Sequence, residues 1–171
     1  MNSNKEFILC IKDIKDNDTV LKMKNFVQHY DTSCYDHCYK VSLISFLICK
    51  KLKLDYKAAA RAGFLHDLFL YDWHVKSEEH KPLHGFRHPY IALRNASKLY
   101  NLSKKEQDII KKHMWPLTVI PPRYLESYVV SFADKYCAIS ESLKHYIENK
   151  KFQKLYRYAY LFFGLIIFKS L

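Results

Sequence analysis

The chain has 171 residues, of which 49% are hydrophobic and 16% aromatic, a composition that excludes a disordered chain and suffices for one buried core. With only 3 glycines and 5 prolines, it has too few turn signals for an all-β protein. The formal net charge of +11 comes from lysines in scattered pairs, without a basic stripe interleaved with aromatic residues. We therefore expect solvated helix faces, with attraction of a phosphorylated small molecule as the alternative and nucleic acid as the least favoured partner.

Hydrophobic spacing predicts an all-α chain of helices joined by short turns. The stretch 30–33 breaks the pattern and supplies N-caps for a long helix, and Asp55 is the expected N-cap of the next one. Pro89 suits the first position of a helix, and Ser103 with Glu106 fits a capping box. In chain order, the predicted helices cover about residues 6–15, 19–29, the long helix through about 53, 55–70, 89–100, 103–113 and 125–147.

Two stretches fall outside this pattern. The segment 71–87 is irregular and dense in histidine, charged and aromatic residues, and it predicts the longest loop, a common place for function. The apolar run Tyr158–Phe168 is too short to span a bilayer as a helix. We expect it to form a terminal helix that packs on the domain or on a partner subunit in a homodimer, with a membrane-surface anchor as the alternative.

The five cysteines are odd in number and form no CxxC pair, and the N-terminus shows no secretory leader. These features predict reduced thiols in a cytoplasmic protein. Cys34 and Cys38 lie one helical turn apart beside His37, where packing is the favoured role and a thiolate ligand the alternative.

The most informative motif is the doublet His66-Asp67, which closes the apolar helical run 58–65. An uncompensated buried charge costs several kcal/mol, so a buried aspartate usually has a cation or a metal ion beside it. On a helix the two side chains project about 100° apart, so both can reach one ion between them. The doublet therefore predicts a metal site.

Further oxygen and nitrogen donors accompany the doublet. Asp134 shares a helix face with Val130, so its carboxylate should point toward the core. His37 lies on an apolar face, where a hydrogen-bonded core histidine is the alternative, and His88 and His113 lie at predicted helix ends. The set contains no thiolate and suits divalent ions such as Fe, Mn, Co, Ni or Zn. It comprises His37, His66, Asp67, His88, His113 and Asp134.

The phrases AGFLHD, HP, IIKKH and VVSFADKY follow one another at intervals that resemble those of the HD-domain metal-dependent phosphohydrolase superfamily. Within it, the chain is similar to a bacterial group with HGFRHP and HMWPLT segments, here 84–89 and 113–118. The resemblance covers about 31–141. It implies one HD-like helical bundle over 1–171, with N-terminal helices before the core and the C-terminal apolar helix after it.

The resemblance also implies roles for the six donors. His88 and His113 match extra histidines that hold a second ion, with Asp67 bridging the two ions. His84 competes with His88 for this role, but the spacing from His88 to His113 matches better. The principal ion would be held by His37, His66, Asp67 and Asp134.

The implied reaction is hydrolysis of a phosphomonoester or phosphoanhydride, most plausibly in a nucleotide, by metal-activated water. The expected catalytic residues are Asp67, His84 and Arg87, and His74 and Lys81 also flank the site. Leu70 stands where many such proteins carry a lysine. The alternatives are a di-iron oxygenase on the same fold and a non-catalytic metal-binding regulatory module. Tyr71, Trp73 and Trp115 are available to stack on a base, although packing is the favoured use of each.

Overall fold

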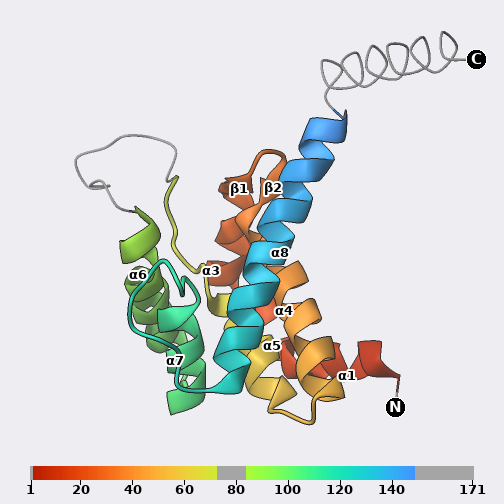
Figure 1. Ribbon diagram of the computed structural model, residues 1–171, viewed down its shortest axis with the longest axis vertical. Coiled ribbons are helices and arrows are strands. Elements are labelled where there is room, and N and C mark those ends of the chain that lie inside the picture. The colour runs from red at the N-terminus through yellow and green to blue at the C-terminus, as the bar shows by residue number, and fades with distance from the viewer. Residues whose placement is uncertain (1, 73–83, 149–171) are drawn as a thin grey trace, which may run out of the picture.

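The computed structural model describes residues 2–72 and 84–148, which form helices and one small β-hairpin (Figure 1). The elements are α1 (Ser3–Cys10), α2 (Lys12–Lys15), α3 (Asp18–Leu21), the 3₁₀ helix η1 (Lys22–Asn25), β1 (Val27–His29), β2 (Thr32–Ser33), α4 (Cys34–Lys51), α5 (Tyr56–Leu65), α6 (His84–Leu99), α7 (Lys104–Lys112) and α8 (Leu125–Glu148). The predicted all-α fold class is confirmed. The single-domain boundary of 1–171 stays a prediction.

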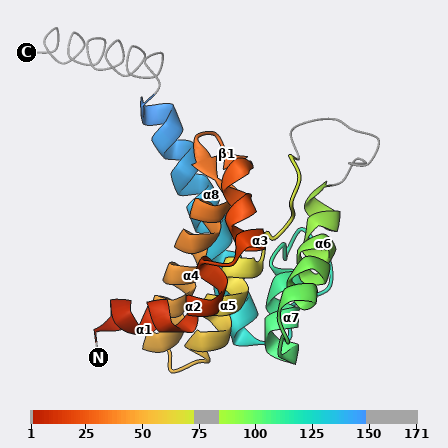
Figure 2. The same cartoon turned by 180° about the vertical axis from the view of Figure 1, so that it is seen from behind.

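The long helices pack around a common centre. Helix α4 packs on both α5 and α8, α5 also contacts α7, and α6 and α7 lie side by side. Figures 1 and 2 show the α6–α7 pair on one side of the α4–α5–α8 group and α1 across its lower end. Fully buried side chains such as Phe46, Phe64 and Ile110 fill the core. The charged and histidine side chains discussed below lie where α4 to α8 meet.

Three of the predicted helix starts are confirmed by their caps. The side chain of Ser33 accepts a hydrogen bond from the backbone N–H of Asp36 at the start of α4. Asp55 caps α5 in the same way, and Ser103 with Glu106 forms the predicted capping box of α7. A side-chain acceptor at these positions satisfies backbone N–H groups that the first helical turn leaves free.

The predicted helix over 19–29 is wrong. Its first part forms the short α3 and η1, and its last part forms β1, which pairs antiparallel with β2. Along β1 the side chains alternate between exposed Val27, buried Gln28 and half-buried His29, the two-residue period of a strand. Tyr30, with φ of 51°, makes the left-handed turn that reverses the chain. The predicted helix over 6–15 is also interrupted, at Ile11.

Two further boundaries differ from the predictions. Helix α5 ends at Leu65 rather than near Leu70, so His66 and Asp67 lie in the turn that follows the helix. Helix α6 begins at His84, so both His88 and Pro89 lie inside it rather than at its start. Pro89 is the sixth residue of α6, beyond the four N–H groups that a helix start leaves free, so its ring removes one hydrogen bond of the helix. Most of the predicted loop 71–87, and the run Tyr158–Phe168, lie outside the described residues.

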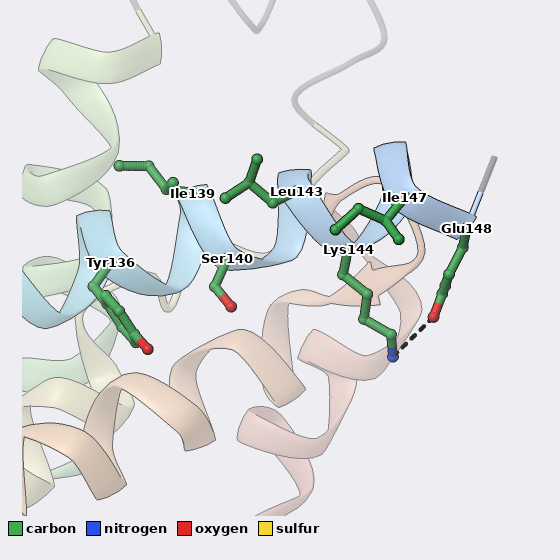
Figure 3. A pocket seen from close by; sticks show the side chains of 7 residues that line it. All are labelled: Tyr136, Ile139, Ser140, Leu143, Lys144, Ile147 and Glu148. Atoms are coloured by element: carbon green, nitrogen blue, oxygen red, sulfur yellow. Dashed lines mark ion pairs between the residues drawn. The ribbon is translucent and has the colours of Figure 1, made fainter. Parts of the chain in front are cut away.

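Helix α8 has two different long faces. One is buried against the bundle, and the other carries exposed apolar side chains, among them Phe132, Ile139 and Ile147, each about three-fifths exposed. Figure 3 shows the second half of this outer face, where an ion pair joins Lys144 and Glu148 beside the apolar residues. In the described part of the chain, no helix combines the length and the apolar character needed to cross a membrane.

Candidate metal centre

All six predicted metal ligands converge in the interior, and each is at most 9% exposed. They come from five places in the fold: α4, the turn after α5, α6, the end of α7, and α8. Among the described residues, four groups of donors have ligand atoms within 4.8 Å of one another, and three of these groups consist of the predicted ligands alone. These three are His37–His66–Asp67, His66–His113–Asp134 and Asp67–His88–His113.

The first part of the cluster surrounds Asp134. Its Oδ1 atom lies 3.1 Å from Nε2 of His37 and 3.5 Å from Nε2 of His66. The Nε2 atom of His66 also lies 3.4 Å from Oδ2 of Asp67. These four side chains therefore present nitrogen and oxygen atoms to one small volume.

The second part of the cluster lies on the other side of Asp67. Its Oδ1 atom is 3.2 Å from Nε2 of His88 and 3.5 Å from Nε2 of His113. The two Nε2 atoms are only 2.7 Å apart. Asp67 thus contacts both parts of the cluster through its two carboxylate oxygens. His113 also lies close to both parts, since its ligand atom is within 4.8 Å of those of His66 and Asp134.

Backbone carbonyls fix two of the rings. Nδ1 of His66 donates to the carbonyl of Gly63, and Nδ1 of His113 donates to that of Ile110, both at 2.8 Å. Because a carbonyl can only accept, each Nδ1 carries a proton, so in the neutral form of each ring, the form that binds metals, Nε2 carries a lone pair that faces the cluster. Histidine metal ligands are oriented in this way.

Two buried atoms test whether a metal ion fits here. Nε2 of His66 and Oδ1 of Asp67 have no hydrogen-bond partner, although buried polar atoms are nearly always satisfied. In the neutral ring Nε2 of His66 offers only a lone pair, and ionised Asp67 offers only acceptors. A divalent cation satisfies both, and nitrogen and oxygen donors without a thiolate suit Fe, Mn, Co, Ni or Zn. The six side chains of the cluster therefore fit a divalent metal ion.

The electrostatics of the cluster favour the ligand forms of the two carboxylates and of His113. At His66, burial lowers the pKa, but Asp67 and the other neighbours of the ring together outweigh burial, so that the pKa lies well above its usual value. Burial alone would raise the pKa of Asp67, but His66 and His88 lower it below its usual value. Burial also opposes ionisation of Asp134, but the neighbouring His37 and His66 bring its pKa well below the ordinary range. Burial, aided by His66 and His88, lowers the pKa of His113 to about 3. The carboxylates are therefore charged and His113 is neutral, the form that binds metals.

The other predicted site residues have different positions. Arg87 is exposed on α6 and lines a surface cavity with Phe86 and Arg94 rather than the buried cluster. Burial and Asp67 raise the pKa of Tyr71, and Arg87 opposes that shift. Trp115 packs edge-on against Tyr128. His74, Lys81, Trp73 and the side chain of His84 lie outside the described part of the chain.

The two cysteines near the cluster are thiols rather than donors in any of the four groups found in the described residues. Burial raises the pKa of Cys38 well above that of a free thiol, and Cys34 raises it further. The Sγ atom of Cys34 contacts the backbone carbonyl of Asp67 at 3.3 Å. The favoured packing role agrees with these surroundings.

Two residues around the cluster were not predicted. Nε2 of Gln28, on β1, donates to Oδ2 of Asp67 at 2.6 Å, and Glu141, on α8, accepts from Nδ1 of His37 at 3.0 Å. Glu141 lies seven residues after Asp134 and so shares its helix face, a spacing that the sequence contains. Gln28 gave no such signal, because its segment was predicted as a helix.

A comparison with protein-family models matches the HD domain over residues 34–139. This range is more than half of the chain and contains all six convergent donors, so the chain belongs to the HD-domain superfamily of metal-dependent phosphohydrolases. Comparisons with curated proteins and with solved structures gave no significant match. The family model supports the fold and metal-dependent hydrolase chemistry in general. Gln28 and Glu141 lie outside the matched range.

Proposed function

We propose that this protein hydrolyses a phosphomonoester or phosphoanhydride, preferably in a nucleotide, as a metal-dependent enzyme. The observation that carries the proposal is the convergence of six buried donors, two of whose atoms have no other partner. Bound ions in such a site lower the pKa of water and neutralise phosphoryl oxygens as charge develops on them. An ester- or anhydride-cleaving hydrolase uses both effects.

In this proposal the ligand roles follow the two parts of the cluster. Asp67 belongs to both parts, and its two carboxylate oxygens face different histidines. His88 and His113 would join Asp67 around a second ion. The first ion would be held by His37, His66, Asp67 and Asp134.

Arg87 is the proposed phosphate-binding residue. It immediately precedes the predicted ligand His88 in the sequence. Its side chain is exposed, so its guanidinium is available to an anion. Bidentate hydrogen bonding to phosphate is the chemistry that arginine does best. His84 stays a predicted catalytic residue that would either bind phosphate or protonate a leaving group. The proposed partner is a phosphorylated small molecule, and a homodimer and a cytoplasmic location stay predictions.

The test begins with metal-free protein reloaded separately with Mn, Fe, Co, Ni and Zn and assayed for phosphate release from a panel of phosphorylated metabolites. We expect release with at least one metal and none from the Asp67→Ala variant. Turnover that requires oxygen and releases no phosphate would favour the oxygenase instead. An Asp67→Ala protein that loses metal but keeps its biological effect would favour the regulatory module.

A further inference from the structure

His37 differs from the other oriented histidines in what its Nδ1 atom can reach. His66 and His113 lie just beyond helix ends, where backbone carbonyls three residues earlier are free to accept. His37 is the fourth residue of α4, so the carbonyls that precede it accept the hydrogen bonds of the helix itself. Its ring therefore needs an acceptor from another part of the chain.

Glu141 supplies that acceptor from α8. Its Oε2 atom lies 3.0 Å from Nδ1 of His37, and its Oε1 atom accepts a hydrogen bond from Nζ of Lys40 at 2.8 Å. The Glu141 side chain is only 5% exposed, whereas that of Lys40 is 49% exposed. Both oxygens of this buried carboxylate are thus engaged, one with a ligand and one with a cation at the surface.

We infer that Glu141, held in place by Lys40, is a positioning residue that fixes His37 with its Nδ1–H outward and its Nε2 lone pair toward Asp134. A carboxylate in this position also makes the imidazole a stronger ligand, and loss of such a partner weakens metal binding about 10- to 100-fold. The inference rests on the proposed metal centre but not on the reaction.

One other arrangement uses the same residue. His29, His37 and Glu141 form the fourth group whose ligand atoms lie within 4.8 Å, so Glu141 would there be a ligand itself. The contacts favour the positioning role, because Lys40 and His37 already engage the two carboxylate oxygens. The number of bound ions separates the two roles. If Glu141 is a direct ligand, its replacement removes one ion; if it positions His37, its replacement lowers the affinity and keeps the number of ions.

The experiment compares zinc binding to the metal-free wild type, Glu141→Gln and Glu141→Ala by chelator competition. Glu126→Gln is the matched control, because Glu126 is a similarly buried glutamate on α8 whose lysine partner, Lys105, also lies at 2.8 Å. We expect zinc affinity to fall about 10- to 100-fold in Glu141→Ala and less in Glu141→Gln, whose amide oxygen can still accept from Nδ1. Affinity in Glu126→Gln should equal that of the wild type.

A second readout reports the tautomer directly. In ¹⁵N NMR spectra of the zinc-loaded wild type, we expect His37 to carry its proton on Nδ1 and to bind zinc through Nε2. Zinc on Nδ1, wild-type affinity in Glu141→Ala, or the loss of one whole zinc from both Glu141 variants would overturn the inference. If the wild type itself binds no zinc or other divalent ion, the proposed metal centre fails with it. If the wild type binds zinc and the Glu141 variants bind it with the same affinity, the positioning role fails and the proposed metal centre stands.

Discussion

Two regions of the described chain contain buried carboxylates, and the partners of these carboxylates differ. Near the N-terminal half of α7, Glu106 pairs with Arg61 at 3.0 Å and Glu126 pairs with Lys105 at 2.8 Å. In the cluster among α4 to α8, by contrast, Asp67 is surrounded by histidines, and one of its oxygens has no hydrogen-bond partner.

The difference separates groups that serve the fold from groups that serve a ligand. A buried carboxylate with a guanidinium or ammonium partner is complete within the chain, and removing the partner costs stability. A buried carboxylate that faces only lone-pair nitrogens has lost its hydration without gaining a partner, and a divalent cation can offset this unfavourable free energy. The first region should therefore control stability without affecting metal binding, and the second should do the reverse.

The largest expected effect comes from Asp67, which contacts both parts of the cluster. Asp67→Ala should lower metal-dependent phosphate release at least about a thousandfold, since metal ions contribute several kcal/mol to such transition states. Steady-state kinetics at saturating metal measure the loss. Glu106→Gln is the control and should keep activity; a comparable loss there would erase the distinction between the regions.

Arg61 tests the ion-paired region. Arg61→Met leaves the buried Glu106 without its cation, and we expect the free energy of unfolding to fall by about 2 kcal/mol. Denaturant unfolding measures this change, and the bound metal per folded chain should stay at the wild-type level. Adding Glu106→Gln should restore part of the stability, because the unpaired charge is then gone. Reduced metal content in Arg61→Met would contradict the separation.

Gln28 gives a smaller effect on the metal side. Its amide donates to Asp67 at 2.6 Å, and Gln28→Leu should weaken metal affinity about tenfold, because the carboxylate loses the hydrogen bond that orients it. Chelator competition measures the affinity. Gln28→Glu, which places a carboxylate against Asp67, should bind metal no better than Gln28→Leu; wild-type affinity in both variants would exclude this orienting role.

The smallest expected effect is a change in pH dependence. Burial opposes ionisation of Glu126, but Lys105 and the backbone N–H of Asp55 lower its pKa below the usual value. A lowered folded-state pKa contributes stability above the unfolded-state pKa of about 4.3, and this contribution is lost as the pH falls through the folded-state value. Unfolding midpoints from pH 7 to 3 should therefore fall less steeply in Glu126→Gln than in the wild type, and equal slopes would contradict the pairing.

Local signals were sufficient for much of the fold. Ser33, Asp55 and the Ser103–Glu106 box mark helix starts through contacts within four residues, and such contacts can be inferred from sequence. The β-hairpin was missed because its pairing depends on Tyr30 in a left-handed turn, which hydrophobic spacing does not report.

The sequence singled out the six donors that converge, but not the residues around them. The six donors follow a motif order, and the structure brings them together, although their ligand roles remain predictions. The partners of the ligands depend on tertiary contacts, since Gln28 and Asp67 are 39 residues apart and Glu141 and His37 are 104 apart. Neither helical spacing nor capping connects positions so distant, so these contacts required the folded chain.

The most direct test of the central claim, that the cluster is built for divalent ions, is the number of ions bound per chain. Metal-free wild type and Asp67→Ala are dialysed to equilibrium against Mn, Fe, Co, Ni or Zn, and the bound metal is measured by elemental analysis. We predict one or two ions per chain in the wild type with at least one of these metals, and fewer in Asp67→Ala. A wild type that retains no more of any metal than Asp67→Ala would contradict the claim.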